Sequence, residues 1–172
     1  MMDRNNRYNR LTIMQHNVRS WNSSKFALSN IYNNLNPDII LINEHSITTN
    51  KNLKIFNYKV FQSNKQNERN RGTAIAIKNN IHPILHDYFH SDLLAITIDT
   101  THGPLTIATH YNPPRDNYLN YIDFHSLFKI PGQIIFIGDL NAKHHVLGHN
   151  NKNNTGKQLA YIINKYLSLI HI

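Results

Sequence analysis

The chain contains no cysteine, which excludes disulfide bridges, thiolate nucleophiles and zinc sites built on sulfur. Long apolar runs are also missing. The longest, such as 39–42 and 134–137, fall far short of the ~20 residues that cross a bilayer. Residues 1–10 are polar and basic without an apolar segment, so no signal peptide is predicted. We therefore expect an intracellular protein that is not embedded in a membrane.

Acidic residues are scarce, with 10 Asp and Glu against 18 Lys and Arg and a formal net charge of +8. Such a balance favours a polyanionic partner such as nucleic acid, with drift of composition as the competing explanation. A length of 172 residues fits one domain with a buried core. We expect a basic arm over 1–10 and a single domain over 11–172.

Hydrophobic periodicity predicts strands that alternate with helices at both ends of the chain and follow one another in its centre. The expected strands are 11–18, 38–43, 58–63, 73–78, 81–86, 93–99, 105–111, 133–138 and 167–172. The expected helices are 24–35, 117–128 and 156–167. A turn at 101–104 joins two strands into a hairpin. An all-parallel sheet would need helices between most strands, so we predict two packed mixed sheets flanked by helices, an α/β/β/α sandwich.

Local patterns also predict helix ends and burial. The first helix should begin at an N-cap of Ser23 or Ser24, present Leu28, Ile31, Tyr32 and Leu35 on one face and stop at Asn36-Pro37. Thr155 should cap the last helix. The strands 38–43 and 133–138 are apolar at successive positions, which predicts burial on both faces.

Polar side chains stand at the ends of four predicted strands. Asn17 lies near the end of the first, Glu44 follows the second, Tyr111 ends a central strand, and Asp139 and Asn141 follow 133–138. If these strands lie side by side, one cleft gathers carboxylates for a hard divalent ion and amide and phenol groups for phosphate oxygens. Each residue also has a simpler explanation, as a turn, a cap, a solvated loop residue or part of the core.

The order of these residues resembles the endonuclease/exonuclease/phosphatase superfamily, and within it the endonuclease domain of LINE-type, jockey-like retrotransposons. Six segments carry the resemblance in the expected order. They are 11–19, whose strand ends in Asn, 37–44 ending in Glu, the Gly-led strand 71–77, Tyr111-Asn112-Pro113-Pro114, Gly138-Asp139-Leu140-Asn141-Ala142-Lys143-His144 and Asn154-Thr155-Gly156-Lys157-Gln158-Leu159. Leu140 stands where the family has an aromatic residue, and Leu147 where it often has Trp.

The resemblance implies a role for each site residue. Glu44 would bind Mg²⁺ or Mn²⁺ with help from Asn17, and Asp139 would orient or deprotonate the attacking water. Asn141 and Tyr111 would contact the phosphate. His144 is a further candidate for a place near the phosphate. The reaction would be an in-line attack on phosphorus, with the metal neutralising charge in the transition state.

The implied partner is duplex DNA at a target site, nicked in the nucleus by a monomeric module fused to a reverse transcriptase. Candidate DNA contacts are Arg69, Arg71, Lys143 and Arg115, with a solvated loop as the alternative for each. A zinc site on the neighbouring His144 and His145 is disfavoured, because adjacent strand residues point apart and no cysteine supports them.

One expected motif, the family's final Ser-Asp-His, does not occur before Ile172, and His171 has no Asp before it. We therefore expect the domain to lack its last strands at the C-terminus and to be inactive or weakly active by itself. Two alternatives stay open. The chain could be a catalytically dead nucleic-acid-binding fragment or a phosphomonoesterase of the same superfamily, although Tyr111-Asn112-Pro113-Pro114 argues against the latter.

Overall fold

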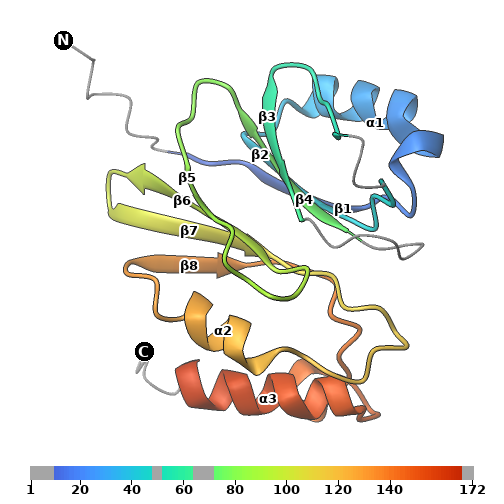
Figure 1. Cartoon of the computed structure of the whole chain (residues 1–172), viewed down its shortest axis with the longest axis vertical. Helices are drawn as coiled ribbons and strands as arrows, with labels where there is room; N and C mark the ends of the chain where they lie inside the picture. The colour runs from blue at the N-terminus through green and yellow to red at the C-terminus, as the bar shows by residue number, and fades with distance from the viewer. Residues whose placement is uncertain (1–9, 48–51, 64–71, 168–172) are drawn as a thin grey trace.

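The strands of the chain pair into two four-stranded sheets (Figure 1). The computed structural model describes residues 10–47, 52–63 and 72–167 of the chain. The first sheet has the order β1-β2-β4-β3, from Ile13–Asn17, Ile39–Asn43, Thr73–Lys78 and Tyr58–Gln62. The second has the order β5-β6-β7-β8, from Ile84–His86, Leu94–Thr100, Gly103–Thr109 and Gln133–Phe136.

Helices cover the outer face of each sheet, which completes the predicted α/β/β/α layers (Figure 1). Helix α1 (Trp21–Leu35) packs on the first sheet, and α2 (Tyr121–Leu127) and α3 (Asn154–Leu167) lie along the second. A short 3-10 helix, η1 (His145–Leu147), precedes α3. No helix in the described ranges is both long and apolar enough to span a membrane.

Alternation along β2 builds two of the three cores. Ile39 and Leu41 face the second sheet, whereas Ile40 and Ile42 face α1. All five residues of β2 are buried, as the sequence predicted, because this strand is covered on both faces and lies between β1 and β4. A third core fills the space between the second sheet and the helices α2 and α3.

The two parallel pairs of strands decide where the polar strand ends meet. Strand β1 runs parallel to β2, so that Asn17 pairs with Asn43, and β7 runs parallel to β8. Beyond β7 and β8 the chain continues in parallel, and Tyr111 forms an isolated bridge with Asp139. The remaining pairings are antiparallel and include the predicted hairpin between β6 and β7. The carboxyl ends of β1, β2, β7 and β8 therefore open toward one end of the sandwich.

Strand β8 departs from the prediction of complete burial. It ends at Phe136, and Gln133 and Ile135 are exposed while Ile134 and Phe136 are half-buried. Within the described ranges β8 pairs with β7 alone, so it is an edge strand of the second sheet. An apolar run does not distinguish a central strand from an edge strand, which explains the difference.

Helix α1 also differs from its predicted start and face. It begins at Trp21 behind Ser20, which makes no side-chain cap hydrogen bond, rather than behind Ser23 or Ser24. Trp21, Leu28 and Tyr32 form its buried face, and the Trp21 and Tyr32 rings stack at 6.4 Å. Ile31 and Leu35, predicted on that face, are exposed. The helix ends as predicted at Asn36, in the left-handed conformation with φ 43°.

Smaller differences concern element ends. Strand β5 keeps only the last part of 81–86, and α2 starts at Tyr121 behind an Asn120 cap. Helix α3 starts at Asn154, and Asn153, not Thr155, accepts the capping bond from the Gly156 N–H at 2.8 Å. The predicted arm up to residue 9 and the predicted strand beyond residue 167 lie outside the described residues.

Candidate active site

Three of the predicted site residues come together where β1, β2 and β8 end. The side-chain amide of Asn17 donates to Glu44 Oε1 at 2.6 Å and to Asp139 Oδ2 at 3.2 Å. All three side chains are half-buried. One amide group therefore links the two carboxylates, and it lies between the first sheet and the second.

Glu44 is held by the backbone around its neighbour His45. Glu44 itself adopts φ 56°, a left-handed conformation that turns the chain away from β2. The His45 N–H donates to the Gly72 carbonyl at 3.3 Å, and the His45 carbonyl accepts from the Trp21 N–H at 2.9 Å. The loop after β2 is thereby tied both to the start of β4 and to the first turn of α1.

The His45 ring fills the space behind this loop. Its Nδ1 accepts from the Ile47 N–H at 3.0 Å, and burial lowers the pKa of His45 to about 4, so the ring is neutral at pH 7. A Cβ on Gly72 would lie 2.5 Å from this ring, so the position requires glycine. Sequence reasoning missed His45, because a histidine after a strand carries no signal of burial.

The turn after β8 places Asp139. The Asp139 N–H donates to the His110 carbonyl at 3.0 Å, and its carbonyl accepts from the Asn112 N–H at 2.8 Å. A Cβ on Gly138 would lie 2.3 Å from the His110 carbonyl oxygen. The glycine before the aspartate therefore permits close approach of the two chains and fixes the aspartate beside Tyr111.

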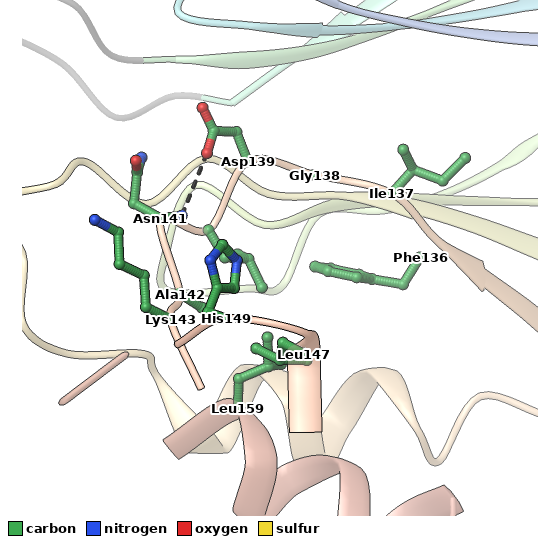
Figure 2. Close-up of a pocket in the computed structure, with 11 residues that line it drawn as sticks. Phe136, Ile137, Gly138, Asp139, Asn141, Ala142, Lys143, Leu147, His149 and Leu159 are labelled. Atoms are coloured by element: carbon green, nitrogen blue, oxygen red, sulfur yellow. Dashed lines mark hydrogen bonds between the residues drawn. The ribbon is translucent and has the colours of Figure 1, made fainter. Parts of the chain in front are cut away.

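Asn141 closes the same turn with φ 47°. Its N–H donates to Asp139 Oδ1 at 3.2 Å, the dashed line in Figure 2, and its side-chain amide donates to the Asn112 carbonyl at 2.9 Å. Asn153 holds the turn from α3, because its amide donates to the Asn141 carbonyl at 2.7 Å while its Oδ1 accepts from the Lys143 N–H at 2.9 Å. Sequence reasoning missed both Asn112 and Asn153 as supports.

A cavity of about 580 Å³ opens beside this turn (Figure 2). Its polar lining comes from Asp139, Asn141, Lys143 and His149, and its apolar wall includes Leu147 and Leu159. Lys143 is exposed at this cavity, where it can meet an anionic backbone. His149 is a residue that the sequence did not single out for the site. It arrives there because Gly148, at φ 78°, turns the chain back after η1.

Tyr111 borders a neighbouring cavity of about 440 Å³ together with Arg115. The Tyr111 side chain is 4% exposed, and Arg115 is exposed at the rim. Because Tyr111 pairs with Asp139, the two cavities adjoin along this stretch of backbone. Arg69 and Arg71, the other predicted DNA contacts, lie outside the described residues.

His144, predicted near the phosphate, is not among the residues that line the main cavity. Its Nδ1 accepts from the Val146 N–H at 3.3 Å, so it caps η1. Desolvation and the charges of Lys152, His145 and Lys157 lower the pKa of His144, which marks the surface around η1 as electropositive. In the part of the chain that the structure describes, no group of three or more histidine, cysteine and acidic side chains could hold a metal ion.

The cluster of Asn17, Glu44 and Asp139 suits a hard divalent cation. Mg²⁺ prefers oxygen ligands and often binds through one or two carboxylates, keeping water molecules and substrate phosphates for the rest of its shell. Two carboxylates meet here around a single neutral amide. That amide now donates its N–H groups to both carboxylates, so a cation at this place would take over the charge compensation that Asn17 supplies.

Comparison with known proteins identifies the family of the chain. Residues 14–164 match the model of the Endonuclease/Exonuclease/phosphatase family. The chain belongs to that family. The family resemblance predicted from the six segments is thus confirmed, and membership places the chain in a family of endonucleases, exonucleases and phosphatases.

Relatives and solved structures refine the comparison. Over 133 residues the chain is 27% identical to the RNA-directed DNA polymerase from mobile element jockey of Drosophila funebris. The matched stretch covers 74% of this chain and 14% of that protein. The endonuclease domain of TRAS1, a telomere-specific non-LTR retrotransposon, superposes with a TM-score of 0.67 at 20% identity, covering 91% of this chain and 71% of the other. An AP endonuclease from Archaeoglobus fulgidus gives 0.65 at 19% identity, covering 95% and 72%. These structures share the fold.

Proposed function

We propose that this chain is the phosphodiesterase module of a retrotransposon protein that nicks DNA with a divalent metal ion, Mg²⁺ or Mn²⁺. The observation that carries the proposal is the meeting of Asn17, Glu44 and Asp139 at the ends of three strands, beside a cavity with a basic rim. These strand ends bring together residues up to 122 positions apart in the sequence. If the three residues served only as turn or cap residues, they would have no reason to meet.

Each side chain has a task that its geometry allows. Glu44 and Asn17 would hold the metal, which when bound would neutralise charge on the phosphate in the transition state. Asp139 offers a carboxylate that can accept a proton from an attacking water. Asn141, Tyr111 and Lys143 border the adjoining cavities and would orient the phosphate, Lys143 through its charge.

The identity of the relatives supports DNA as the substrate. The jockey relative is an RNA-directed DNA polymerase, and the TRAS1 domain is an endonuclease of a retrotransposon. The net charge of +8 and the basic surface around η1 suit a polyanion. By this proposal the chain acts on target DNA in the nucleus, as a monomeric module of a protein that also carries a reverse transcriptase.

A plasmid-nicking assay tests the proposal. Supercoiled DNA is incubated with the protein, with Mg²⁺, Mn²⁺ or EDTA, both as these 172 residues and as the longest reading-frame product that contains them. We expect metal-dependent conversion to open circles, and a loss of about 10²-fold or more in the Glu44→Ala and Asp139→Ala variants. Asp87→Ala, which removes an exposed carboxylate just after β5, is the matched control.

Three other outcomes would decide against the proposal. Equal nicking by wild type, Glu44→Ala and Asp139→Ala would show that the cluster does not act. Hydrolysis of small phosphate monoesters without nicking of DNA would indicate a phosphomonoesterase. Binding of DNA without any hydrolysis by either form of the protein would indicate a catalytically dead nucleic-acid-binding fragment.

A further inference from the structure

A groove lined by tyrosines lies between the start of α2 and the first half of α3, outside the site described above. Its cavity measures about 320 Å³, and Tyr118, Tyr121, Tyr161 and Lys157 form its walls. We call it the tyrosine groove. Tyr118 and Tyr161 are 63% and 59% exposed, an unusual state for two large aromatic side chains in one pocket.

The groove is built before any ligand arrives. Its floor consists of Leu119 and Ile162, both buried. The Leu119 N–H donates to Gln158 Oε1 at 2.6 Å, which ties one wall to the other. The rings of Tyr121 and Tyr161 lie 6.0 Å apart and are tilted by 46°. The two exposed rings therefore stand on a fixed base and need little ordering to receive a flat ligand.

The charge around the groove is positive. Lys157 lines it, Lys165 Nζ lies 5.1 Å from the centre of the Tyr121 ring, and none of the described residues that line it is acidic. The charges of Lys157 and Lys152 both contribute to lowering the pKa of His144, which caps η1. The positive surface therefore continues from the groove to η1. An apolar protein segment would gain nothing from these lysines, whereas a phosphate backbone would.

The groove is also continuous with the candidate active site. Tyr118 lines both the tyrosine groove and the cavity that contains Tyr111 and Arg115. A strand that passes the phosphate contacts at Arg115 would therefore meet the exposed ring of Tyr118 next. Single-stranded nucleic acids bind where a basic track runs beside aromatic rings that stack on bases.

We propose that the tyrosine groove binds single-stranded nucleic acid, with an unpaired base stacked on Tyr118 and Tyr161 and its phosphates beside Lys157 and Lys152. The biological role of the groove rests on the proposed function, because the groove would hold the unpaired strand near a nick made by that nuclease. The binding itself does not need catalysis.

Fluorescence of a 2-aminopurine base within an oligothymidylate tests the groove directly, because stacking on a tyrosine ring quenches it. With the whole chain we expect quenching on binding, an affinity loss of about tenfold for Tyr161→Ala, and retention of both signals in Tyr161→Phe, which keeps the aromatic face. Tyr118→Ala should behave like Tyr161→Ala. Lys157→Gln should lower the slope of log K against log salt by about 0.7. Tyr88→Ala, 51% exposed beside β5, is the matched control.

The same titration in the Glu44→Ala variant separates this proposal from the proposed function, because quenching should persist there while nicking is lost. Tyrosine-dependent quenching in a protein that never nicks DNA supports the groove and contradicts the nuclease. The proposal for the groove is wrong if the Tyr118→Ala, Tyr161→Ala double variant nicks DNA and binds oligothymidylate with unchanged affinity and quenching. It is also wrong if the groove binds an apolar peptide and oligothymidylate does not compete with that peptide.

Discussion

Asn17 donates a hydrogen bond to Asp139 across 3.2 Å, although the two residues are 122 positions apart. Asn17 ends β1 of the first sheet, and Asp139 lies in the turn after β8 of the second sheet. The same amide nitrogen lies 2.6 Å from Glu44 Oε1. A neutral donor between two carboxylates reduces their mutual repulsion in the absence of a cation. The stability of the folded chain should therefore depend on what occupies this position.

Asn17→Asp should make folding depend on a divalent cation. Without metal a third carboxylate would lie beside the other two, which we expect to cost about 1–3 kcal/mol, or about 3–10 °C in Tm. Saturating Mg²⁺ should restore most of that loss, since a ligand that binds the folded state stabilises it. Thermal melts with EDTA and with Mg²⁺ measure both effects, and the exposed Asn151→Asp is the control. If Mg²⁺ stabilises neither wild type nor Asn17→Asp, there is no metal site here.

Strand content could be predicted from the sequence where burial leaves a continuous apolar run. The expected strand 38–43 corresponds to β2 within one residue, and 73–78 to β4 at both ends. The gathering of Asn17, Glu44 and Asp139 could also be predicted, because residues that follow parallel strands meet at one edge. The edge position of β8 could not be predicted. The exposure of Ile135 depends on which strands flank β8 and not on the residues of β8 itself.

Supports of the site were beyond prediction for a different reason. His45, Asn112 and Asn153 act through hydrogen bonds that cross between elements, and no local periodicity records such bonds. His144 was placed near the phosphate on the resemblance alone, but it caps η1, and His149 reaches the cavity after the turn at Gly148.

Asn153 offers a way to separate helix capping from positioning of the active-site turn. Asn153→Asp keeps the oxygen that accepts from Lys143 and Gly156 but loses the N–H that holds the Asn141 carbonyl. We expect its stability to stay within about 0.5 kcal/mol of wild type, because Asp is also a good N-cap. Nicking should fall by about tenfold, seen mainly in kcat, since the turn that carries Asn141 is released.

Asn153→Ala is the companion variant, because it removes the cap as well. Its free energy of unfolding should drop by about 1–2 kcal/mol, measured by urea denaturation. If Asn153→Asp nicks DNA at the wild-type rate while Asn153→Ala is unstable, the residue is a helix cap and nothing more.

Substitution of Gly156 by alanine has two opposing effects on stability, a gain in helix propensity and a steric clash. Alanine is preferred over glycine inside a helix by about 1 kcal/mol, which alone predicts that Gly156→Ala stabilises α3. A Cβ at this position would lie 1.9 Å from the Lys143 carbonyl oxygen, which is backbone and cannot rotate away. Overpacking of this kind costs about 1–3 kcal/mol. We expect a net loss of about 1–2 kcal/mol in urea denaturation, whereas Asn164→Ala on the exposed face of α3 should be neutral or stabilising. A more stable Gly156→Ala would show that the turn at Lys143 yields.

Asp123 should make the fold sensitive to acid. The side chain is 1% exposed and accepts from the His90 N–H at 2.9 Å, the Ser91 N–H at 2.6 Å and the His90 ring at 3.2 Å, which ties α2 to the loop before β6. Burial by itself raises the pKa of Asp123, but these hydrogen bonds outweigh it, and the net effect is a pKa below the usual value of 3.8.

The sign follows from that direction. A carboxyl whose pKa is lower in the folded state contributes stability above its unfolded pKa and loses it as pH falls through the folded value. At pH 7 Asp123→Asn should cost about 1.5–3 kcal/mol, because hydrogen bonds to a charged acceptor are lost. The gap between wild type and variant should stay constant from pH 7 to about 5 and narrow below about 4 as the wild-type carboxyl protonates. Urea denaturation across this range measures the gap, with the exposed Asp87→Asn as control. A gap independent of pH down to the acid unfolding of the wild type would mean that the charge on Asp123 does not stabilise the fold.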